Sequence, residues 1–334
     1  MPDNHTYVIA EMACSHEGDS KIAEKIIDGA GKAGADAIQF QIWSLKDMVV
    51  PHHKDYELLT RIELSREDWK QLAERVRRSY PDMQIIACVY EASSVDFACS
   101  IDVDAFKIHS ADLSNPNLIH HVAETGKRID LSIGASTLDE IQTAIGWIKA
   151  ASEETPVWLM YGYQVFPTPT GAIHLDFMRK LMDMFELPVG YQDHSDGDEP
   201  AGFYLPAAAV GMGVACLEKH ITHDRSFKGI DHEAALNPEE FTDFIKMVRV
   251  LDEAKGVSVP RPFIPQEEAY RKNSKKSIVA AHTIQSGQVI RKSDLLYMRA
   301  SELGLPPDHA PVIIGKIADR DIDAFNIITG DDVS

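Results

Sequence analysis

Eight short apolar runs recur along the first two thirds of the chain, and a stretch with helical periodicity separates each run from the next. The runs occupy residues 7–12, 37–43, 84–90, 105–108, 129–133, 157–160, 189–191 and 215–221. Strands that alternate with helices favour a parallel sheet, because parallel neighbours need a crossover connection between them. Eight such units match the closed (β/α)8 TIM barrel, a fold of about 250 residues.

The helix starts are marked by capping residues. Ser65 and Thr137 precede acidic first turns, and Asn115 and Asn237 are each followed by proline, as is typical of helix N-termini. The competing fold is an open doubly wound sheet. The first run lacks the G-x-G-x-x-G turn of a dinucleotide-binding sheet, so we expect the barrel and no NAD site.

The residue pattern changes near Gly256. Residues 257–275 contain three prolines and no clear periodicity, which is typical of an extended linker. Short β-like runs follow at 277–281, 288–290 and 312–317. The sequence therefore predicts a catalytic barrel over 1–256, a linker over 257–275 and a small, mostly β domain over 276–334. A unit of about 60 residues is marginally stable alone, so we expect it to pack on the barrel or on a second chain.

Charge and cysteine usage exclude several classes of protein. The net charge of −19 disfavours nucleic-acid and membrane-surface partners, because an acidic surface repels phosphate backbones and anionic headgroups. Small anions are not excluded, since a few local charges can hold them. The four cysteines are widely spaced, which argues against a zinc knuckle or a redox pair. The N-terminus lacks a signal-peptide pattern. We expect a cytoplasmic protein.

Functional groups of a barrel lie at the C-terminal ends of its strands and in the loops that follow. In chain order, this rule selects Glu11, His16, Gln39, Gln41, Cys88, Lys107, Ser110, Asp112, Ser132, Gln164, Phe166, Asp193, His194, Glu218, Lys219, His220 and Asp231. His194 and His220 close neighbouring strands and could share one divalent cation, with waters or substrate oxygens in the remaining positions. The alternative is that one or both are core histidines satisfied by hydrogen bonds.

Charged residues inside barrel strands need a partner. Lys107 could bind a carboxylate or phosphate, form a Schiff base, or lift its ammonium into solvent. For Glu11 and Glu218 the alternative to a catalytic role is a structural ion pair, for example with Lys219.

A series of motifs resembles the sialic acid synthase family, which includes legionaminate and pseudaminate synthases and spore coat polysaccharide members. The motifs are Ala10-Glu11, Ser15-His16-Glu17-Gly18, Phe106-Lys107-Ile108-His109-Ser110, Phe166-Pro167-Thr168-Pro169, Val189-Gly190-Tyr191-Gln192-Asp193-His194, Glu218-Lys219-His220-Ile221-Thr222 and Asp231-His232. The tail, with Ser277-Ile278-Val279-Ala280-Ala281, residues 284–290 and Asp294-Leu295, is similar to that family's C-terminal antifreeze-like (SAF) domain.

The resemblance implies an activity and an assembly. Family members condense phosphoenolpyruvate with an N-acylated mannosamine-type or related hexose, giving a nonulosonic 2-keto acid and phosphate. They are domain-swapped homodimers that use a divalent metal. Manganese is the first expectation here, with magnesium or cobalt as alternatives.

The resemblance also implies roles for individual residues. His194 and His220 match the metal ligands, and Glu11 matches a carboxylate near the reacting carbons. Lys107, Ser110 and Ser132 match groups that hold phosphoenolpyruvate. Gln41, Glu218 and Asp231 match contacts to the sugar, and Arg299 matches an arginine that reaches the partner chain's active site.

The chain departs from the family pattern at several positions. Lysine, threonine, asparagine, tyrosine and serine are usual where this chain has Gln39, Cys88, Gln164, Phe166 and Gln192. Losing a cationic partner weakens anion binding by roughly 1.5–3 kcal/mol, so the resemblance implies a divergent branch with an altered anion site. Arg299 is followed by Ala-Ser rather than the usual Pro-Gly.

Two other functions remain open at this stage. A metal-dependent aldolase on the same barrel would use pyruvate or another donor, as the altered anion site allows. A non-catalytic carbohydrate-binding homologue would keep the fold alone, although the joint retention of Glu11, Lys107, His194 and His220 argues against it.

Overall fold

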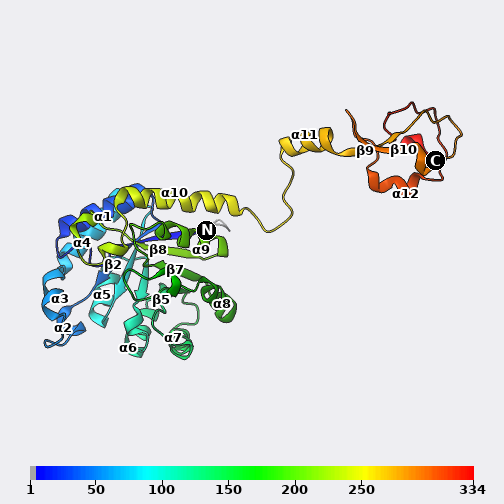
Figure 1. Ribbon diagram of the computed structural model, residues 1–334. Coiled ribbons are helices and arrows are strands. Elements are labelled where there is room, and N and C mark those ends of the chain that lie inside the picture. The colour runs from blue at the N-terminus through cyan, green and yellow to red at the C-terminus, as the bar shows by residue number, and fades with distance from the viewer. Residues whose placement is uncertain (1–4) are drawn as a thin grey trace. The chain divides into compact units, whose positions relative to one another are not determined.

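A closed barrel of eight parallel strands forms the first part of the computed structural model, which describes residues 5–334 (Figure 1). The strands are β1 (Tyr7–Glu11), β2 (Ala37–Ile42), β3 (Gln84–Val89), β4 (Ala105–Ile108), β5 (Arg128–Ser132), β6 (Val157–Tyr161), β7 (Val189–Asp193) and β8 (Cys216–His220). β1 pairs with both β2 and β8, so the sheet has no edge. The predicted barrel is confirmed and the open sheet is wrong. Residues 1–4 of the predicted barrel domain lie outside the described residues.

Ten helices connect and surround these strands. They are α1 (Ser20–Ala33), α2 (Leu45–Met48), α3 (Tyr56–Ile62), α4 (Arg66–Ser79), α5 (Ala92–Ser100), α6 (Pro116–Ala123), α7 (Leu138–Ala151), α8 (Leu175–Phe185), α9 (Ala201–Met212) and α10 (Pro238–Lys255) within residues 5–256. The predicted caps are confirmed: Ser65, Asn115, Thr137 and Asn237 precede α4, α6, α7 and α10. None of the helices in residues 5–334 has the length and apolar character that a membrane span requires.

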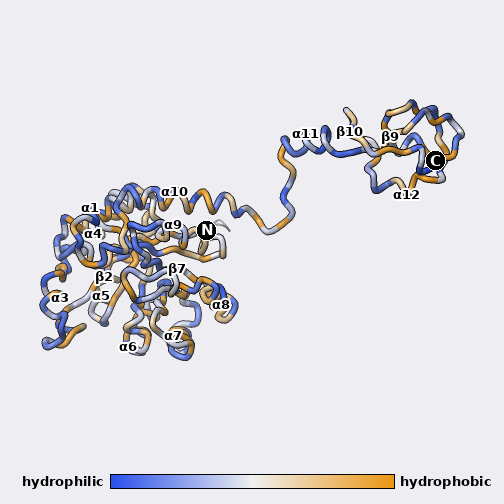
Figure 2. The backbone as a smooth tube through the Cα atoms, in the orientation of Figure 1, coloured by the Kyte–Doolittle hydropathy of each residue, from blue (hydrophilic) through white to orange (hydrophobic). Residues whose placement is uncertain are grey.

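Each strand divides its side chains between two environments. Val8, Ala10, Ile38 and Phe40 belong to a large apolar core shared with the helices. This core includes the buried side of α10, where Phe241, Phe244, Ile245 and Val248 recur at helical spacing, and Figure 2 shows hydrophobic and hydrophilic residues alternating along this helix. Tyr7, Ile9, Ala37, Ile86 and Met160 belong to a separate apolar cluster inside the barrel. Residues two positions further along these strands therefore also face the barrel interior.

An ion pair lies at the N-terminal end of the barrel interior. Arg128 and Asp130 of β5 are joined by two hydrogen bonds of 2.9 and 3.0 Å. The Arg128 guanidinium lies 4.9 Å from the ring centroid of Tyr7 and 4.1 Å from that of Trp158. These large side chains fill this end of the barrel, so the polar groups open to solvent gather at the C-terminal end.

The barrel interior is tightly packed around Gly190. A methyl group there would lie 2.2 Å from Cys216 Sγ and 2.8 Å from Met160 Sδ, whereas one at the exposed Gly211 of α9 would contact nothing within 4 Å. We expect Gly190→Ala to lower the free energy of unfolding by about 1–3 kcal/mol through overpacking. Gly211→Ala is the control and should raise it by up to about 1 kcal/mol. Urea unfolding followed by tryptophan fluorescence measures both, and equal effects of the two substitutions would contradict the packing argument.

Residues 257–334 form a second compact unit. It contains α11 (Pro265–Ser274), the antiparallel pair β9 (Lys276–Ala280) and β10 (Leu295–Arg299), and the short helix α12 (Ala310–Ile313). Ile278, Ala280, Ile284, Ile313 and Ile328 are among the buried residues of its own apolar core.

Three predictions for this part of the chain need correction. The segment 257–275 is not an extended linker throughout, because Pro265 begins a helix whose first turn carries Glu267 and Glu268. The predicted strand at 312–317 is wrong, since Pro311 lies in the first turn of α12. At 288–290 only a single bridge from Val289 to Ile317 forms.

Candidate active site

A cavity of about 280 Å³ opens at the C-terminal ends of the barrel strands. Its lining residues are Glu11, Gln41, Lys107, His109, Gln164, Phe166, Gln192, His194, Glu218, His220 and Asp231. All of these except His109 are residues that sequence reasoning placed in the site. The barrel thus brings together side chains that are separated by up to 220 positions along the chain.

A buried ion pair crosses the interior of the barrel. Lys107 Nζ on β4 donates to both carboxylate oxygens of Glu218 on β8, at 2.6 and 2.7 Å. Both side chains are nearly inaccessible to solvent, with exposed fractions of 6% and 1%. The structural ion pair expected for Glu218 therefore exists, but its partner is Lys107 rather than Lys219.

Lys219 pairs elsewhere. Its ammonium contacts Asp193 Oδ2 at 2.7 Å and the Ser195 carbonyl at 3.1 Å. Successive side chains along a strand point to opposite faces of the barrel wall. His194 and His220 face the interior, so the preceding residues Asp193 and Lys219 point toward the surrounding helices. The expectation that they point into the barrel mouth is wrong.

Glu11 is buried beside this ion pair. Its Oε1 accepts from the Ala13 amide at 2.6 Å and from Gln41 Nε2 at 3.1 Å. Its Oε2 is buried without a hydrogen-bond partner in the described part of the chain. Burial, reinforced by the neighbouring charge of Glu218, raises the pKa of Glu11 to about 8. Oε2 is thus the oxygen on which this carboxyl can carry a proton.

His194 and His220 lie next to each other at the mouth. Their ring centroids are 5.1 Å apart. Phe166 packs against both, with centroid distances of 4.3 Å to His194 and 5.5 Å to His220. His194 Nδ1 lies 2.5 Å from the Tyr163 carbonyl oxygen, so Nδ1 carries the proton and Nε2 keeps its lone pair. Burial lowers the pKa of His194 to about 4 and that of His220 well below its ordinary value.

This pair fits part of a metal centre. Neutral imidazole is the protonation state that binds divalent cations, and the Nδ1 atom of His220 is buried without a hydrogen-bond partner in residues 5–334. Within the same residues no group of three or more His, Cys, Asp or Glu side chains is arranged to hold a metal. A bound cation would therefore take two protein ligands, with waters or substrate oxygens completing its coordination.

An uncharged cluster lies on the β5–β7 side of the mouth. We call Ser132, Gln164 and Gln192 the amide cluster. Gln192 Nε2 donates to Ser132 Oγ at 3.0 Å, and Gln164 Nε2 approaches the same oxygen at 3.4 Å. Ser132 and Gln192 are fully buried. The cluster contains amide and hydroxyl groups and carries no formal charge, and its two glutamines line the cavity.

Asp231 and His109 complete the lining. Asp231 lies in the loop after β8 in the left-handed conformation, with φ of 62°, and burial raises its pKa to about 6. His109 follows β4, and its ring centroid lies 5.7 Å from that of Tyr90. The two-residue spacing from Lys107 places His109 on the same face of the strand, which is the sequence feature that could have identified it.

Besides Asp193 and Lys219, several predicted residues do not line the cavity, namely His16, Gln39, Cys88, Ser110, Asp112, Ser132 and Arg299. Gln39 and Cys88 are buried inside the barrel, and both amide atoms of Gln39 lack a partner within the described residues. Ser110 and Asp112 lie in the turn after β4, where Asp112 accepts from Asn115 Nδ2 at 2.9 Å. Arg299 ends β10 in the second unit and is exposed. Ser132, although absent from the lining, bonds to two residues that form it.

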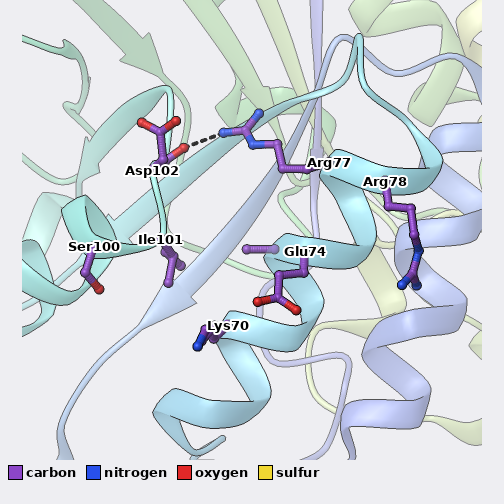
Figure 3. Close-up of a pocket in the computed structure, with 8 residues that line it drawn as sticks. Lys70, Glu74, Arg77, Arg78, Ser100, Ile101 and Asp102 are labelled. Carbon is purple, nitrogen blue, oxygen red and sulfur yellow. Dashed lines mark hydrogen bonds between the residues drawn. The ribbon is translucent and has the colours of Figure 1, made fainter.

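A larger cavity of about 520 Å³ lies on the outside of the barrel, between α4 and the end of α5 (Figure 3). Its lining includes Lys70, Glu74 and Arg78, and Arg77 donates to the Asp102 carbonyl. Arg77 also pairs with Asp104 at 2.9 Å. These helix ends lead into the N-terminal ends of β3 and β4, opposite the mouth, so we place the candidate site at the mouth.

A family model described as the NeuB family matches residues 26–259. The chain belongs to the NeuB family. The resemblance noted from the motifs is thereby confirmed.

The relatives of this NeuB-family chain include enzymes and a solved structure. It is 30% identical to an uncharacterised protein of Methanocaldococcus jannaschii, over 98% of this chain and 94% of that protein. It is 29% identical to the N,N'-diacetyllegionaminic acid synthase of Legionella pneumophila, over 93% and 89% of the two chains. A crystal structure of the N-acetylneuraminic acid (sialic acid) synthetase of Leptospira borgpetersenii, in complex with citrate, has a TM-score of 0.73 and 28% identity, covering 80% of this chain and 92% of that one.

Proposed function

We propose that this NeuB-family protein is a synthase that condenses phosphoenolpyruvate with an N-acylated mannosamine-type or related hexose. The products are a nonulosonic 2-keto acid and phosphate, for surface polysaccharide or glycan biosynthesis. The observation that carries the proposal is the convergence of Glu11, Lys107, Glu218, His194 and His220 on one cavity at the barrel mouth. Legionaminic acid and sialic acid synthases among the relatives support the same substrate class.

The reaction forms one carbon–carbon bond, and on the former enol-phosphate carbon one carbon–oxygen bond forms with water while the bond to the phosphate oxygen breaks. The enol carbon of phosphoenolpyruvate attacks the aldehyde carbon of the open-chain sugar, water adds to the resulting oxocarbenium ion, and the tetrahedral intermediate loses phosphate. A divalent metal on His194 and His220, manganese in the first place, would supply a Lewis acid for the aldehyde oxygen.

The protein's own charged groups have distinct roles in this proposal. Glu218 fixes the Lys107 ammonium at 2.6 Å, and Lys107 would bind an anionic oxygen of phosphoenolpyruvate. Glu11 would stabilise the developing cation or orient the attacking water through Oε2, the oxygen without a hydrogen-bond partner in residues 5–334. Gln41, held between Glu11 and Tyr90, and Asp231 would contact the sugar.

The assay of this proposal measures two products. With manganese, phosphoenolpyruvate and a panel of N-acylated hexosamines, we expect at least one sugar to release phosphate and form a 2-keto acid in equal amounts. Reactions without sugar, and reactions with excess chelator, are the controls and should release none. If a broad panel gave neither product, the synthase proposal would be wrong.

A second candidate function is a metal-dependent aldolase that uses pyruvate. The observation that favours it is the engagement of Lys107 by Glu218 beside an uncharged amide cluster, which leaves little positive charge for a phosphate. Formation of a 2-keto acid from pyruvate, without phosphoenolpyruvate, would support the aldolase.

We also propose that residues 276–334 form an antifreeze-like (SAF) domain and that the protein is a domain-swapped homodimer. The unit has its own small core, and Leu296, Tyr297 and Met298 on β10 are 39–42% exposed, which supports burial of this strand against a second chain.

The four cysteines are free, in keeping with a cytoplasmic location.

The dimer proposal predicts the mass in solution. Light scattering at micromolar concentration should give twice the mass of the 37.1 kDa chain. Arg299→Ala should then raise the KM for the sugar without changing the mass, because Arg299 would reach the partner's site. A monomer by light scattering would contradict both statements.

A further inference from the structure

His109 occupies a defined position above Lys107. In the barrel register, Val89 and Leu131 are the neighbours of Ile108 on the adjacent strands. One residue further toward the mouth, the same register sets His109 between Tyr90 and Ser132. Its ring is in contact with Tyr90, and Ser132 is the centre of the amide cluster. His109 therefore lies beside the groups that sequence reasoning assigned to phosphoenolpyruvate.

The hydrogen bonding of His109 fixes which nitrogen carries a proton. Nδ1 accepts from the Ala111 amide at 3.2 Å, so in the neutral ring the proton is on Nε2. Nε2 makes no hydrogen bond within residues 5–334, and it is not one of the atoms sealed from solvent there. Because the residue lines the cavity, this N–H is accessible from it. Burial, assisted by Lys107, lowers the pKa of His109 to about 4, which keeps the ring neutral at pH 7.

The cavity is lined by more acidic than basic side chains. Three carboxyl groups line it, those of Glu11, Glu218 and Asp231, and in the described residues Lys107 is its one lysine or arginine. Glu218 already bonds Lys107 through both oxygens. An anionic substrate entering this site needs further hydrogen-bond donors, and neutral N–H groups supply them.

We propose that His109 donates its Nε2–H to an anionic oxygen of phosphoenolpyruvate and is thereby a specificity-determining residue for that substrate. The inference rests on the proposed function, since it takes phosphoenolpyruvate as the donor. It assigns the amide cluster and His109 together to the recess that receives the anion.

Three variants test this contact. His109→Leu removes the donor at similar size, and His109→Gln restores a neutral N–H close to the position of Nε2. His52→Leu, at an exposed position, is the matched control. By calorimetry on the full chain with manganese, we expect phosphoenolpyruvate to bind about tenfold more weakly to His109→Leu, as for loss of one hydrogen bond to a charged group. His109→Gln should stay within about threefold of the wild type, and the KM for the sugar should not change.

Two fragments of the substrate identify the oxygen concerned. If only inorganic phosphate binds more weakly to His109→Leu, the contact is to the phosphoryl group; if only pyruvate does, it is to the carboxylate. Unchanged binding of phosphoenolpyruvate to a folded His109→Leu variant would overturn the inference, as would an effect confined to the sugar.

The same measurements separate this inference from the proposed function. A wild-type protein that binds phosphoenolpyruvate in a His109-dependent manner, yet forms no product with any sugar, would defeat the synthase proposal alone. A wild-type protein that forms product while His109→Leu binds phosphoenolpyruvate normally would defeat the inference alone. No binding of phosphoenolpyruvate to the wild type would defeat both.

Discussion

Replacing His220 by alanine is expected to abolish binding of the proposed divalent metal and to lower turnover by roughly a thousandfold, because a Lewis acid would stabilise the transition state by several kcal/mol. His220 is one of two neutral imidazoles at the mouth, and its Nδ1 has no partner within the described residues. The proposed site has two protein ligands, so the loss of one should greatly weaken binding of the cation. The measurement is metal per chain after dialysis against manganese, together with phosphate release.

A surface histidine provides the control for this experiment. His121→Ala removes an imidazole that pairs with Asp96 outside the cavity, and it should leave metal content and turnover unchanged. If His220→Ala retained both the metal and the activity, the metal centre would have to lie elsewhere. Loss of metal with full activity would show that the cation is not needed for the reaction.

Lys107→Met should greatly lower the free energy of unfolding. It leaves the Glu218 carboxylate inside the barrel without its cation, and breaking a buried pair in this way costs about 3–5 kcal/mol. The double variant Lys107→Met/Glu218→Met should recover most of that loss, because an apolar pair of similar volume replaces both charges. Urea unfolding followed by fluorescence is suitable, since all four tryptophans lie between positions 43 and 158, within the barrel.

The pair Lys219–Asp193 offers a matched comparison. It is equally buried and has the same 2.7 Å contact, but it lies on the helix side of the wall. Lys219→Met should lower stability by a similar amount. Lys107→Met, unlike Lys219→Met, should also weaken phosphoenolpyruvate binding. The affinities are measured under conditions in which both single variants are folded. A fully stable Lys107→Met protein would indicate that Glu218 is uncharged in the native state.

The barrel could be predicted because its local patterns agree with its global form. Each strand is a short apolar run, and caps such as Ser65 and Thr137 mark the helices between them. The second unit could not be predicted to the same extent. Pro265 lies in the predicted linker and Pro311 directly precedes the predicted strand at 312–317, yet each lies in the first turn of a helix, where proline's missing N–H costs nothing.

The residues at the mouth could be predicted from the sequence, but the partners in their ion pairs could not. Strand ends meet at one mouth, so position alone identified His194, His220 and Glu11. The partner of Glu218 could not be found in this way, because Lys107 lies across the barrel and 111 residues away in sequence. His109 was not predicted, and its one sequence signal is the two-residue spacing from Lys107, which places both side chains on the same face of the chain.

The division of each strand between two environments has a consequence for how such a chain changes over generations. Side chains that hold the barrel to its helices, such as Phe40 and Phe106, alternate with those that face the substrate cavity. Substitutions at Gln41, Gln164 or Gln192, which line the cavity, can therefore change the shape and polarity of the cavity while leaving the helix-facing core intact. Single substitutions in the cavity can thus accumulate while the fold is kept. A relative that is 30% identical and aligns over 98% of this chain is consistent with this.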